Sequence, residues 1–342
     1  MLTGGECTLS GVPRFSVVVP IHDEEETLPE LHRRLAAVLD SLDEDWELVL
    51  VDDGSRDRSF ETMVELRRQD ERVKIVRLSR NFGHQVAITA GIDLAEGDAV
   101  IVMDGDLQHP PEAIPDLVAH WREGYDVVYG VMAERAGETR FKRWTAKSFY
   151  RLLGRMSDIE VPAAAGDFRL VDRRAVDAFT SLRERNRYVR GMFSWIGFRQ
   201  IGVPYSAQPR AAGHTKYTVP RMTRLAVHGI FSFSNAPLRL VLGLGFLVSA
   251  FASAEAIYAL VCKFGGFYTV PGWSSIVFVV ALLGGIQLIV LGVMGEYVSL
   301  IYDEAKRRPI YLVRELHGFE RNSSVSDPAP DPGSDPAPDP GR

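Results

Sequence analysis

Two aspartates one residue apart follow directly on a short apolar run. Asp104 and Asp106 come after the β-rich stretch 99–103, within the sequence VIVMDGDLQHPP. A buried strand that ends in Asp-Gly-Asp places carboxylates at the carboxyl edge of a sheet, where open α/β folds bind ligands. Carboxylate oxygens suit Mg²⁺ or Mn²⁺ bound together with substrate phosphates. The alternative is a simple turn, because Asp-Gly is also a common turn dipeptide.

Polar residues also follow three earlier apolar runs. The run 15–20 continues into HDEEETL, the run 46–51 into DDGS, and the run 73–78 into SRNFG. Helical patterns at 25–42, 59–69 and 85–95 lie between the runs, and this alternation predicts parallel strands joined by crossover helices. The nearly continuous apolar strands indicate a sheet covered on both faces. One polar strand end could be a helix N-cap, but four at one edge favour a ligand site.

Composition excludes several classes of protein. The chain has 342 residues, enough for a large domain and additional segments, and its net charge of −6 argues against general nucleic-acid binding. Cys7 and Cys262 are too far apart to suggest a zinc site or a disulfide scaffold, which fits a reducing compartment. The N-terminal sequence MLTGGECTLSGVPR has no basic region followed by an apolar run, so we expect no signal peptide.

Two long apolar runs near the C-terminal end predict a pair of transmembrane helices. The runs 238–262 and 274–300 are each long enough to cross ~30 Å of hydrocarbon, and the short loop 263–273 predicts a hairpin. The flanking basic residues are Arg221 and Arg224 before the first run, Arg239 at its start, and Lys306, Arg307 and Arg308 after the second, with Lys263 in the loop. This bias places the folded domain and both termini in the cytoplasm. Buried core helices are the alternative.

Three other features outside the first domain are distinctive. The segment 217–237 interleaves apolar and basic residues, as an amphipathic helix in the membrane interface would, although an ordinary surface helix is also compatible. The tail from Ser323 repeats DPAPDPG and is expected to be disordered. Glu255 lies inside the first apolar run, where an acid is either functional or placed at the interface.

Taken together, these motifs resemble family 2 glycosyltransferases. The motifs are VVVPIHDEEETL, VDDGS, LSRNFGHQVAITAGI, DGDLQHPPE, AAAGDFRLVDRR and GHTKY. More narrowly, the chain is similar to polyprenyl-phosphate glycosyltransferases, the group of dolichyl-phosphate mannose synthases and bacterial undecaprenyl-phosphate glucosyltransferases. The C-terminal GEYVSLIYDEAKRRPIY matches the bacterial subgroup, and the resemblance covers about 15–313.

The resemblance implies an α/β fold of the GT-A (Rossmann-like) class, followed by amphipathic interfacial helices and a two-helix transmembrane hairpin. The expected organisation is an N-terminal extension 1–13, a GT-A catalytic domain 14–212, a juxtamembrane amphipathic segment 213–237, two transmembrane helices within 238–302, a cytoplasmic segment 303–322, and a disordered Pro/Asp-rich tail 323–342. The implied location is the inner (plasma) membrane.

The resemblance also implies site residues. The nucleotide-sugar-binding set is Pro20, His22, Glu24, Asp53, Gly83, Gln85, Asp104, Arg210 and Lys216. The metal set, for Mg²⁺ or Mn²⁺, is Asp104, Asp106 and Gln108, and the catalytic set is Asp167, Asp106, Arg135 and Arg143.

Residue chemistry supports several of these roles. Arg135 and Arg143 belong to a basic cluster suited to a lipid phosphate, although a solvated face is the alternative. Arg210 and Lys216 flank a glycine, as in a loop that orders on a diphosphate. Asp167 follows small residues and is expected to orient acceptor or sugar; the alternative is a structural salt bridge to a nearby arginine, Arg169 or Arg173.

The implied activity is inverting transfer of a hexose-type sugar from a nucleotide sugar, expected to be UDP-linked, to undecaprenyl phosphate at the cytoplasmic membrane face. A phosphate monoester with a second pKa of about 6 is already largely dianionic at neutral pH, so no strong base is required. Alternatives are a GDP-mannose-dependent synthase, a processive polysaccharide synthase and a non-catalytic scaffold. A processive enzyme would need more spans and a QxxRW-type motif, and the intact DGDLQ argues against a scaffold. A homo-oligomer packed through the hairpins stays open.

Overall fold

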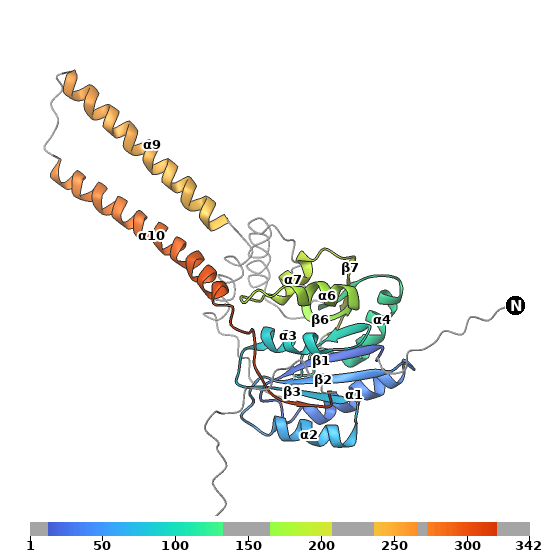
Figure 1. The fold of residues 1–342 in the computed structure, drawn as a ribbon. Helices are drawn as coiled ribbons and strands as arrows, with labels where there is room; N and C mark the ends of the chain where they lie inside the picture. Colours follow the sequence, from blue (N-terminus) through green and yellow to red (C-terminus); the bar gives the residue numbers. More distant parts are fainter. Residues whose placement is uncertain (1–12, 133–164, 207–235, 266–271, 320–342) are drawn as a thin grey trace, which may run out of the picture.

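A mixed eight-stranded sheet forms the centre of the folded domain. The computed structural model describes residues 13–132, 165–206, 236–265 and 272–319. The strands are arranged in the order β7-β5-β6-β4-β1-β2-β3-β8, and two long helices project away from the sheet (Figure 1).

The first half of the sheet is parallel, as the sequence predicts. Its strands are β1 (Phe15–Ile21), β2 (Trp46–Asp52), β3 (Val73–Leu78) and β4 (Ala99–Val102), and its crossover helices are α1 (Leu28–Asp40), α2 (Ser59–Gln69) and α3 (His84–Leu94). β1 pairs in parallel with both β2 and β4, and β2 pairs in parallel with β3. The carboxyl ends of all four strands therefore lie at one edge.

The alternate side chains of β1 enter two separate apolar clusters. Phe15, Val17 and Val19 pack in a cluster with buried leucines of α1, whereas Val18 packs with Ile88 and other residues of α3. Both faces of the sheet are therefore covered, which confirms the interpretation of the continuous apolar strands. Burial of both faces explains why these strands carry few polar side chains.

The second half of the sheet reverses direction at β6. Its elements are η1 (Pro111–Ala113), α4 (Ile114–Arg122), β5 (Val127–Met132), β6 (Ala165–Asp172), α6 (Arg173–Ser181), α7 (Val189–Trp195) and β7 (Gln200–Tyr205). β6 runs antiparallel to both β4 and β5, with Arg169 opposite Val102. Because the two strands are antiparallel, the residues before Arg169 lie beside the residues after Val102. This register brings Asp167 to the end of β4.

Two long helices follow the sheet domain and lie side by side in Figure 1. They are α9 (Ala236–Phe264) and α10 (Trp273–Ala305). The stretch Leu282–Ala305 of α10 is long and apolar enough to cross a membrane, and α9 contains a shorter apolar stretch, Val241–Ala254. Large apolar side chains such as Leu288 and Ile301 are about 70% exposed, at 72% and 68%. One membrane-spanning helix is thus supported, and the second span stays a prediction.

The chain returns to the sheet after α10, which the sequence did not indicate. β8 (Val313–His317) pairs antiparallel with β3. Arg77 donates to Glu315 at 3.0 Å, and the backbone N–H of Ser79 donates to the carbonyl of Leu312 at 2.8 Å. The segment expected to be merely cytoplasmic, 303–322, therefore supplies a strand of the domain.

Several expectations concern parts of the chain outside the described residues. The N-terminal extension up to residue 12, the amphipathic segment up to residue 235 and the tail from residue 320 are among them. The side chain of Glu255 is also outside what the structure describes.

Close packing of α3 on the sheet generates the first prediction. A Cβ added at Gly91 would overlap Val18 Cγ1 and would lie 3.0 Å from Val51 Cγ2. Helix propensity alone would favour Gly91→Ala by about 1 kcal/mol. We expect it instead to lower the free energy of unfolding by about 1–3 kcal/mol, because the helix is pushed off the sheet. Denaturant unfolding of the full-length protein measures the change.

A double-mutant cycle tests the cause of this loss. Val18→Ala removes the methyl groups nearest to the added Cβ. The double variant Val18→Ala/Gly91→Ala should be less destabilised than the sum of the two single changes, because contacting residues do not contribute additively. A stabilised Gly91→Ala protein, or strict additivity, would contradict the packing argument.

Candidate functional site

Asp53 joins the end of β2 to the loop that follows β3. Its carboxylate follows β2 and accepts the backbone N–H groups of Phe82 at 2.7 Å and Gly83 at 2.9 Å. Gly83 begins α3 with φ 102°, a conformation that L side chains rarely adopt. Burial raises the pKa of Asp53, and the two backbone hydrogen bonds oppose this rise. In this structure both carboxylate oxygens of Asp53 therefore shape the loop that leads into α3.

The end of β1 meets the same loop. The imidazole of His22 lies 3.3 Å from the side-chain amide of Asn81. Pro20 is buried within β1, opposite Val51 of β2, and the backbone N–H of Glu24 donates to the Ser59 hydroxyl at 2.9 Å. His22, which follows β1, is thus in contact with the loop that follows β3, two strands away in the sheet.

Gln85 makes a contact that the sequence did not suggest. Its side-chain oxygen accepts the backbone N–H of Val189 at 3.0 Å. This bond ties the first turn of α3 to the beginning of α7. Gln85 therefore has a clear part in positioning α7 on α3.

The DGDLQ loop is tightly folded after β4. Leu107 has φ 60°, a left-handed conformation that is uncommon for a residue with a side chain and often marks functional sites. The turn lets Asp106 accept the backbone N–H of Gln108 at 3.1 Å as well as its side-chain amide. The two side chains of this predicted metal pair thus contact each other. A cation bound between Asp106 and Gln108 would have to replace the hydrogen bond that joins their side chains.

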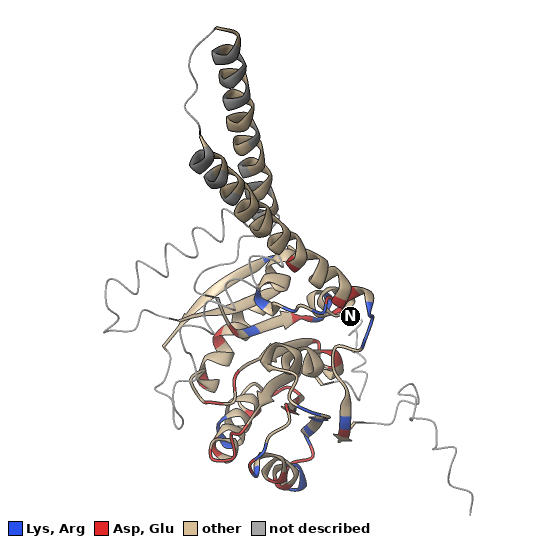
Figure 2. Cartoon of the chain, turned by 90° about the vertical axis from the view of Figure 1, so that its left-hand side faces the viewer, with Lys and Arg blue, Asp and Glu red and all other residues tan. Residues whose placement is uncertain are grey.

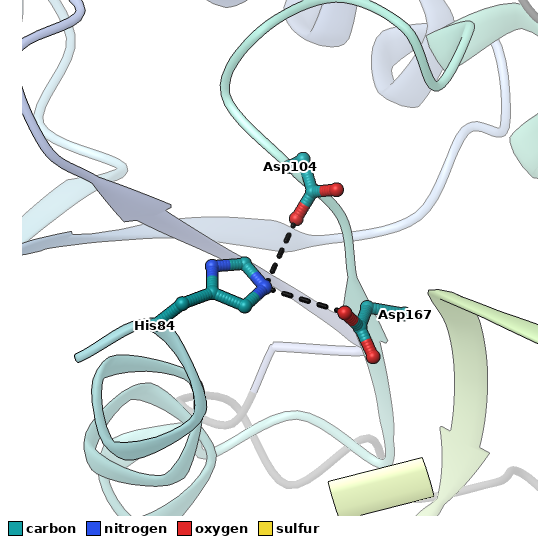
Figure 3. Close-up of side chains that lie close together, drawn as sticks. All are labelled: His84, Asp104 and Asp167. Atoms are coloured by element: carbon teal, nitrogen blue, oxygen red, sulfur yellow. Dashed lines mark hydrogen bonds and ion pairs between the residues drawn. The ribbon is translucent and has the colours of Figure 1, made fainter. Parts of the chain in front are cut away.

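Three side chains from separate elements converge beside this loop (Figure 3). His84 at the start of α3 places its Nε2 3.3 Å from Asp167 Oδ2 and 3.4 Å from Asp104 Oδ1. One possible ligand atom from each residue lies within 4.8 Å of those of the other two. We call His84, Asp104 and Asp167 the edge triad.

Asp167 is also held by a residue that the sequence did not single out. Arg190 of α7 donates to both of its oxygens, from Nε at 2.8 Å and from Nη2 at 3.0 Å. Arg169 is more distant, at 4.0 Å, whereas Arg173 donates to the backbone carbonyl of Gly97 at 2.9 Å. The alternative of a salt bridge is thus realised with Arg190 rather than with the nearby arginines proposed for it.

Burial and charge act in opposite directions on the edge triad. Burial raises the pKa of Asp167, but Arg190 and the hydrogen bond from His84 outweigh it and hold this pKa well below its usual value. Burial lowers the pKa of His84, yet the bond to Asp167 and the charge of Asp104 raise it overall. Burial raises the pKa of Asp104, against the opposing effect of His109 and His84. The site therefore keeps Asp167 ionised.

The donor set of the edge triad fits a divalent cation. Asp104 Oδ1 is buried and, among the described residues, has the His84 Nε2 contact at 3.4 Å but accepts no hydrogen bond, so a cation there would supply a ligand that this oxygen lacks. One imidazole nitrogen and two carboxylates are typical ligands for Mn²⁺ and related metals. Asp104 belongs both to the edge triad and to the set predicted from the sequence, Asp104, Asp106 and Gln108.

The structure therefore brings together most of the residues predicted for the site that it describes. Four of them, Arg135, Arg143, Arg210 and Lys216, lie outside the described residues. The sequence reasoning missed His84 and Arg190. His84 could have been found, because it begins a helix at the polar edge within the quoted motif LSRNFGHQ. Arg190 could not, because only the fold brings α7 beside the start of β6.

Comparisons with known proteins agree on one family. The model of "Glycosyl transferase family 2" matches residues 16–180. The chain is 47% identical to YkcC, an uncharacterized glycosyltransferase of Bacillus subtilis (strain 168), over 92% of this chain and 97% of that protein. It is 36% identical to the SfII prophage-derived bactoprenol glucosyl transferase of Shigella flexneri, over 89% of this chain and 98% of that protein.

Among solved structures, the chain resembles S. aureus TarS in complex with UDP-GlcNAc. The TM-score is 0.43 at 19% identity, and the match covers 64% of this chain and 66% of that one.

Metal binding can be tested without any substrate. We expect Asp104→Asn to weaken Mn²⁺ binding by at least about tenfold, because Asp104 Oδ1 is a buried carboxylate oxygen that accepts no hydrogen bond from the described residues. His84→Gln should weaken binding to a similar degree if the edge triad holds the ion, and electron paramagnetic resonance titration of free Mn²⁺ measures both. Asp116→Asn, on the exposed side of α4, is the matched control. Unchanged affinity in Asp104→Asn would exclude both ligand sets.

Proposed function

Because the chain belongs to glycosyl transferase family 2, we propose that it transfers glucose from UDP-glucose to undecaprenyl phosphate at the cytoplasmic face of a membrane. The observation that carries this proposal is the 36% identity to a bactoprenol glucosyl transferase over 98% of that protein's length. That the protein is a glycosyltransferase with a GT-A-like α/β fold follows from the family match and the mixed sheet. The identities of the sugar, the nucleotide and the acceptor are what we propose.

The nucleotide is proposed to bind across the ends of β1, β2 and β3. His22 and Asn81 contact each other there, and the Asp53 carboxylate fixes the loop beside them. In this arrangement Asp53 acts on the nucleotide through the position of the 81–83 loop. Ligand binding at the carboxyl ends of parallel strands is the general behaviour of open α/β sheets.

The diphosphate is proposed to lie over the DGDLQ loop. Asp104 would hold the divalent cation there, with its other ligands drawn from Asp106 and Gln108 or from the rest of the edge triad. A bound Mg²⁺ or Mn²⁺ would neutralise charge on the departing nucleoside diphosphate. Arg210 and Lys216 are proposed to add positive charge from a loop of this chain.

The chemical step needs an oriented acceptor more than a base. One oxygen of the lipid phosphate forms a bond to the anomeric carbon while the bond from that carbon to the nucleoside diphosphate breaks, so an α-linked donor gives a β-linked product. The phosphate is already ionised and no proton has to be removed. The low pKa of Asp167 makes it a poor proton acceptor. We therefore assign it an orienting role together with Arg190.

The acceptor phosphate is proposed to approach through Arg135 and Arg143. Their guanidinium groups suit bidentate contacts to a phosphate. Support for this assignment comes from the residue types and from their place in the chain, between the DGDLQ loop and the GDFRL strand.

Membrane attachment is proposed to use both α9 and α10. The apolar stretch of α10 ends at Ala305 and is followed by Lys306, Arg307 and Arg308. Figure 2 shows that Lys and Arg are scarce along the described part of the two helices and reappear where the chain rejoins the domain. The positive-inside rule then puts the domain in the cytoplasm and the loop between the helices on the other side.

A reconstituted transfer assay tests the proposal directly. Purified full-length protein with undecaprenyl phosphate and Mn²⁺ should release UDP from UDP-glucose, and no release should occur when the lipid is omitted. GDP-mannose and other nucleotide sugars serve as competing donors. Preference for GDP-mannose would overturn the donor assignment, and release of nucleotide without acceptor lipid would overturn the acceptor assignment.

Asp106→Ala tests the role of the DGDLQ loop in this reaction. Loss of a group that positions charge around the leaving diphosphate should lower turnover by about 10²–10³-fold. Asp116→Ala on α4 removes the same charge from an exposed helix and should leave turnover unchanged. Thermal unfolding checks that both variants are folded. Wild-type turnover by a folded Asp106→Ala protein would remove this residue from the mechanism.

Asp167→Asn separates orientation from a purely structural pairing. We expect kcat to fall at least about tenfold while nucleotide affinity, measured by UDP binding, stays within twofold, because Asp167 lies beside β4 and the nucleotide is proposed to bind across the ends of β1, β2 and β3. Stability should also fall, since Arg190 loses its charged partner. A merely structural role predicts that Asp167→Asn and Arg190→Gln lose stability alike while the folded fraction keeps wild-type kcat.

A further inference from the structure

A charged cavity lies at the junction of α10 with the sheet domain. Its volume is about 590 Å³, and its lining comes from α3, from the segment between α6 and α7, and from the end of α10 with the residues that follow. The lining residues are Asp93, Arg183, Arg185, Glu304, Arg307, Arg308, Pro309, Ile310 and Tyr311. Four arginines therefore stand against two carboxylates in a protein whose net charge is negative. We call it the junction cavity.

Part of this charge is used to build the cavity. Asp93 accepts bonds from Arg183 at 2.7 Å and from the Tyr311 hydroxyl at 3.0 Å. Arg185 donates to the carbonyl of Asp303 at 3.2 Å and to that of Arg308. These contacts hold the end of α10 on the domain. They give Asp93, Arg183 and Arg185 partners within the protein.

The guanidinium groups of the remaining two arginines, Arg307 and Arg308, do not take part in these contacts. Among the described residues, Arg307 and Arg308 are exposed and neither guanidinium group is in a hydrogen bond or close ion pair, although the charge of Arg308 attracts that of Asp303. Arg307 has φ 48°, so the chain turns sharply where these charges enter the cavity wall. Two unpaired guanidinium groups on one wall present a ready site for an anion with several oxygens.

The place of the cavity along the chain indicates the source of that anion. Arg307 and Arg308 come two and three residues after the apolar stretch that ends at Ala305. A helix that crosses the hydrocarbon puts such residues at the level of the lipid headgroups. Basic pockets at this depth bind the phosphate groups of anionic lipids.

The junction cavity is separate from the reaction site. α3 begins at His84 of the edge triad and ends at Leu94, next to Asp93 of the junction cavity. The helix has 11 residues, so its two ends lie roughly 15 Å apart. A phosphate in the junction cavity therefore could not reach the edge triad, and its lipid would be a resident lipid rather than the acceptor.

We propose that the junction cavity binds the phosphate headgroup of an anionic membrane lipid, of the phosphatidylglycerol class, through Arg307 and Arg308. This inference rests on the membrane placement given under Proposed function and not on the transfer reaction. A lipid held there would fix the angle between α10 and the sheet domain, because the same cavity wall carries the contacts of Arg185 and Asp93.

The test uses purified full-length protein in a neutral detergent, without nucleotide or acceptor. Dioctanoyl phosphatidylglycerol, dioctanoyl phosphatidylcholine and inorganic phosphate are titrated separately, and binding is followed by intrinsic fluorescence and by the shift in unfolding temperature. We expect phosphatidylglycerol to bind at least fivefold more tightly than phosphatidylcholine. The double variant Arg307→Gln/Arg308→Gln should weaken phosphatidylglycerol binding at least tenfold.

The control removes two other exposed arginines, far from the junction cavity in the sequence. Arg33→Gln/Arg68→Gln, on α1 and α2, should keep wild-type lipid affinity. Arg307→Lys/Arg308→Lys keeps the charge and should lose less affinity than the glutamine pair, which guards against a folding defect.

Three results would overturn the inference. They are equal affinity for the two lipids, inorganic phosphate binding as tightly as phosphatidylglycerol, and equal losses in the control pair. Asp104→Asn should bind phosphatidylglycerol as the wild type does, so failure of the transfer assay and failure of this site are distinguishable.

Discussion

The close approach of α3 to the sheet is the constraint on which the rest of the site depends. Gly91 lets the helix rest directly on Val18 and Val51, and the Asp53 carboxylate fixes the loop that feeds its first turn. With both held, His84 faces the end of β4, and Gln85 reaches across to α7. A helix displaced by even one methyl group would move all of these contacts together, because well-packed interiors do not deform gradually.

The charge arrangement follows from that placement. Asp104 and Asp167 come from strands of opposite direction, and two like charges at this spacing would repel each other strongly in a buried setting. His84 lies between them, and Arg190 compensates Asp167 from the other side. His84 and Arg190 thus offset part of the negative charge, and one buried oxygen of Asp104 accepts no hydrogen bond from the described residues. Such incomplete satisfaction is costly for stability and is typical of functional sites.

Local pattern was sufficient to predict the parallel half of the sheet. The four apolar runs and three helical patterns correspond to β1–β4 and α1–α3 because each element is signalled by its own residues. The common edge at which Asp53 and Asp104 follow their strands is also predictable, since parallel strands share their direction. The reversal at β6 was not predictable in this way, because nothing local to GDFRL shows which strand it will pair with. The contact of Arg190 with Asp167 and the pairing of β8 with β3 could not be predicted for the same reason. Their partners are distant in sequence, and only the assembled fold brings them near.

The position of β8 has a consequence for the folding of the protein during synthesis. Arg77 and Glu315, which join β3 to β8, are 238 residues apart in sequence. During synthesis β3 therefore remains an unpaired edge strand until α9, α10 and β8 have been synthesised. Unpaired edge strands are sites at which chains aggregate. Closing so long a loop is entropically expensive for a free chain. A bilayer that has already captured α10 would shorten the search, since it holds the segment just before β8 near the domain. β8 therefore completes the sheet only after α10 has been synthesised.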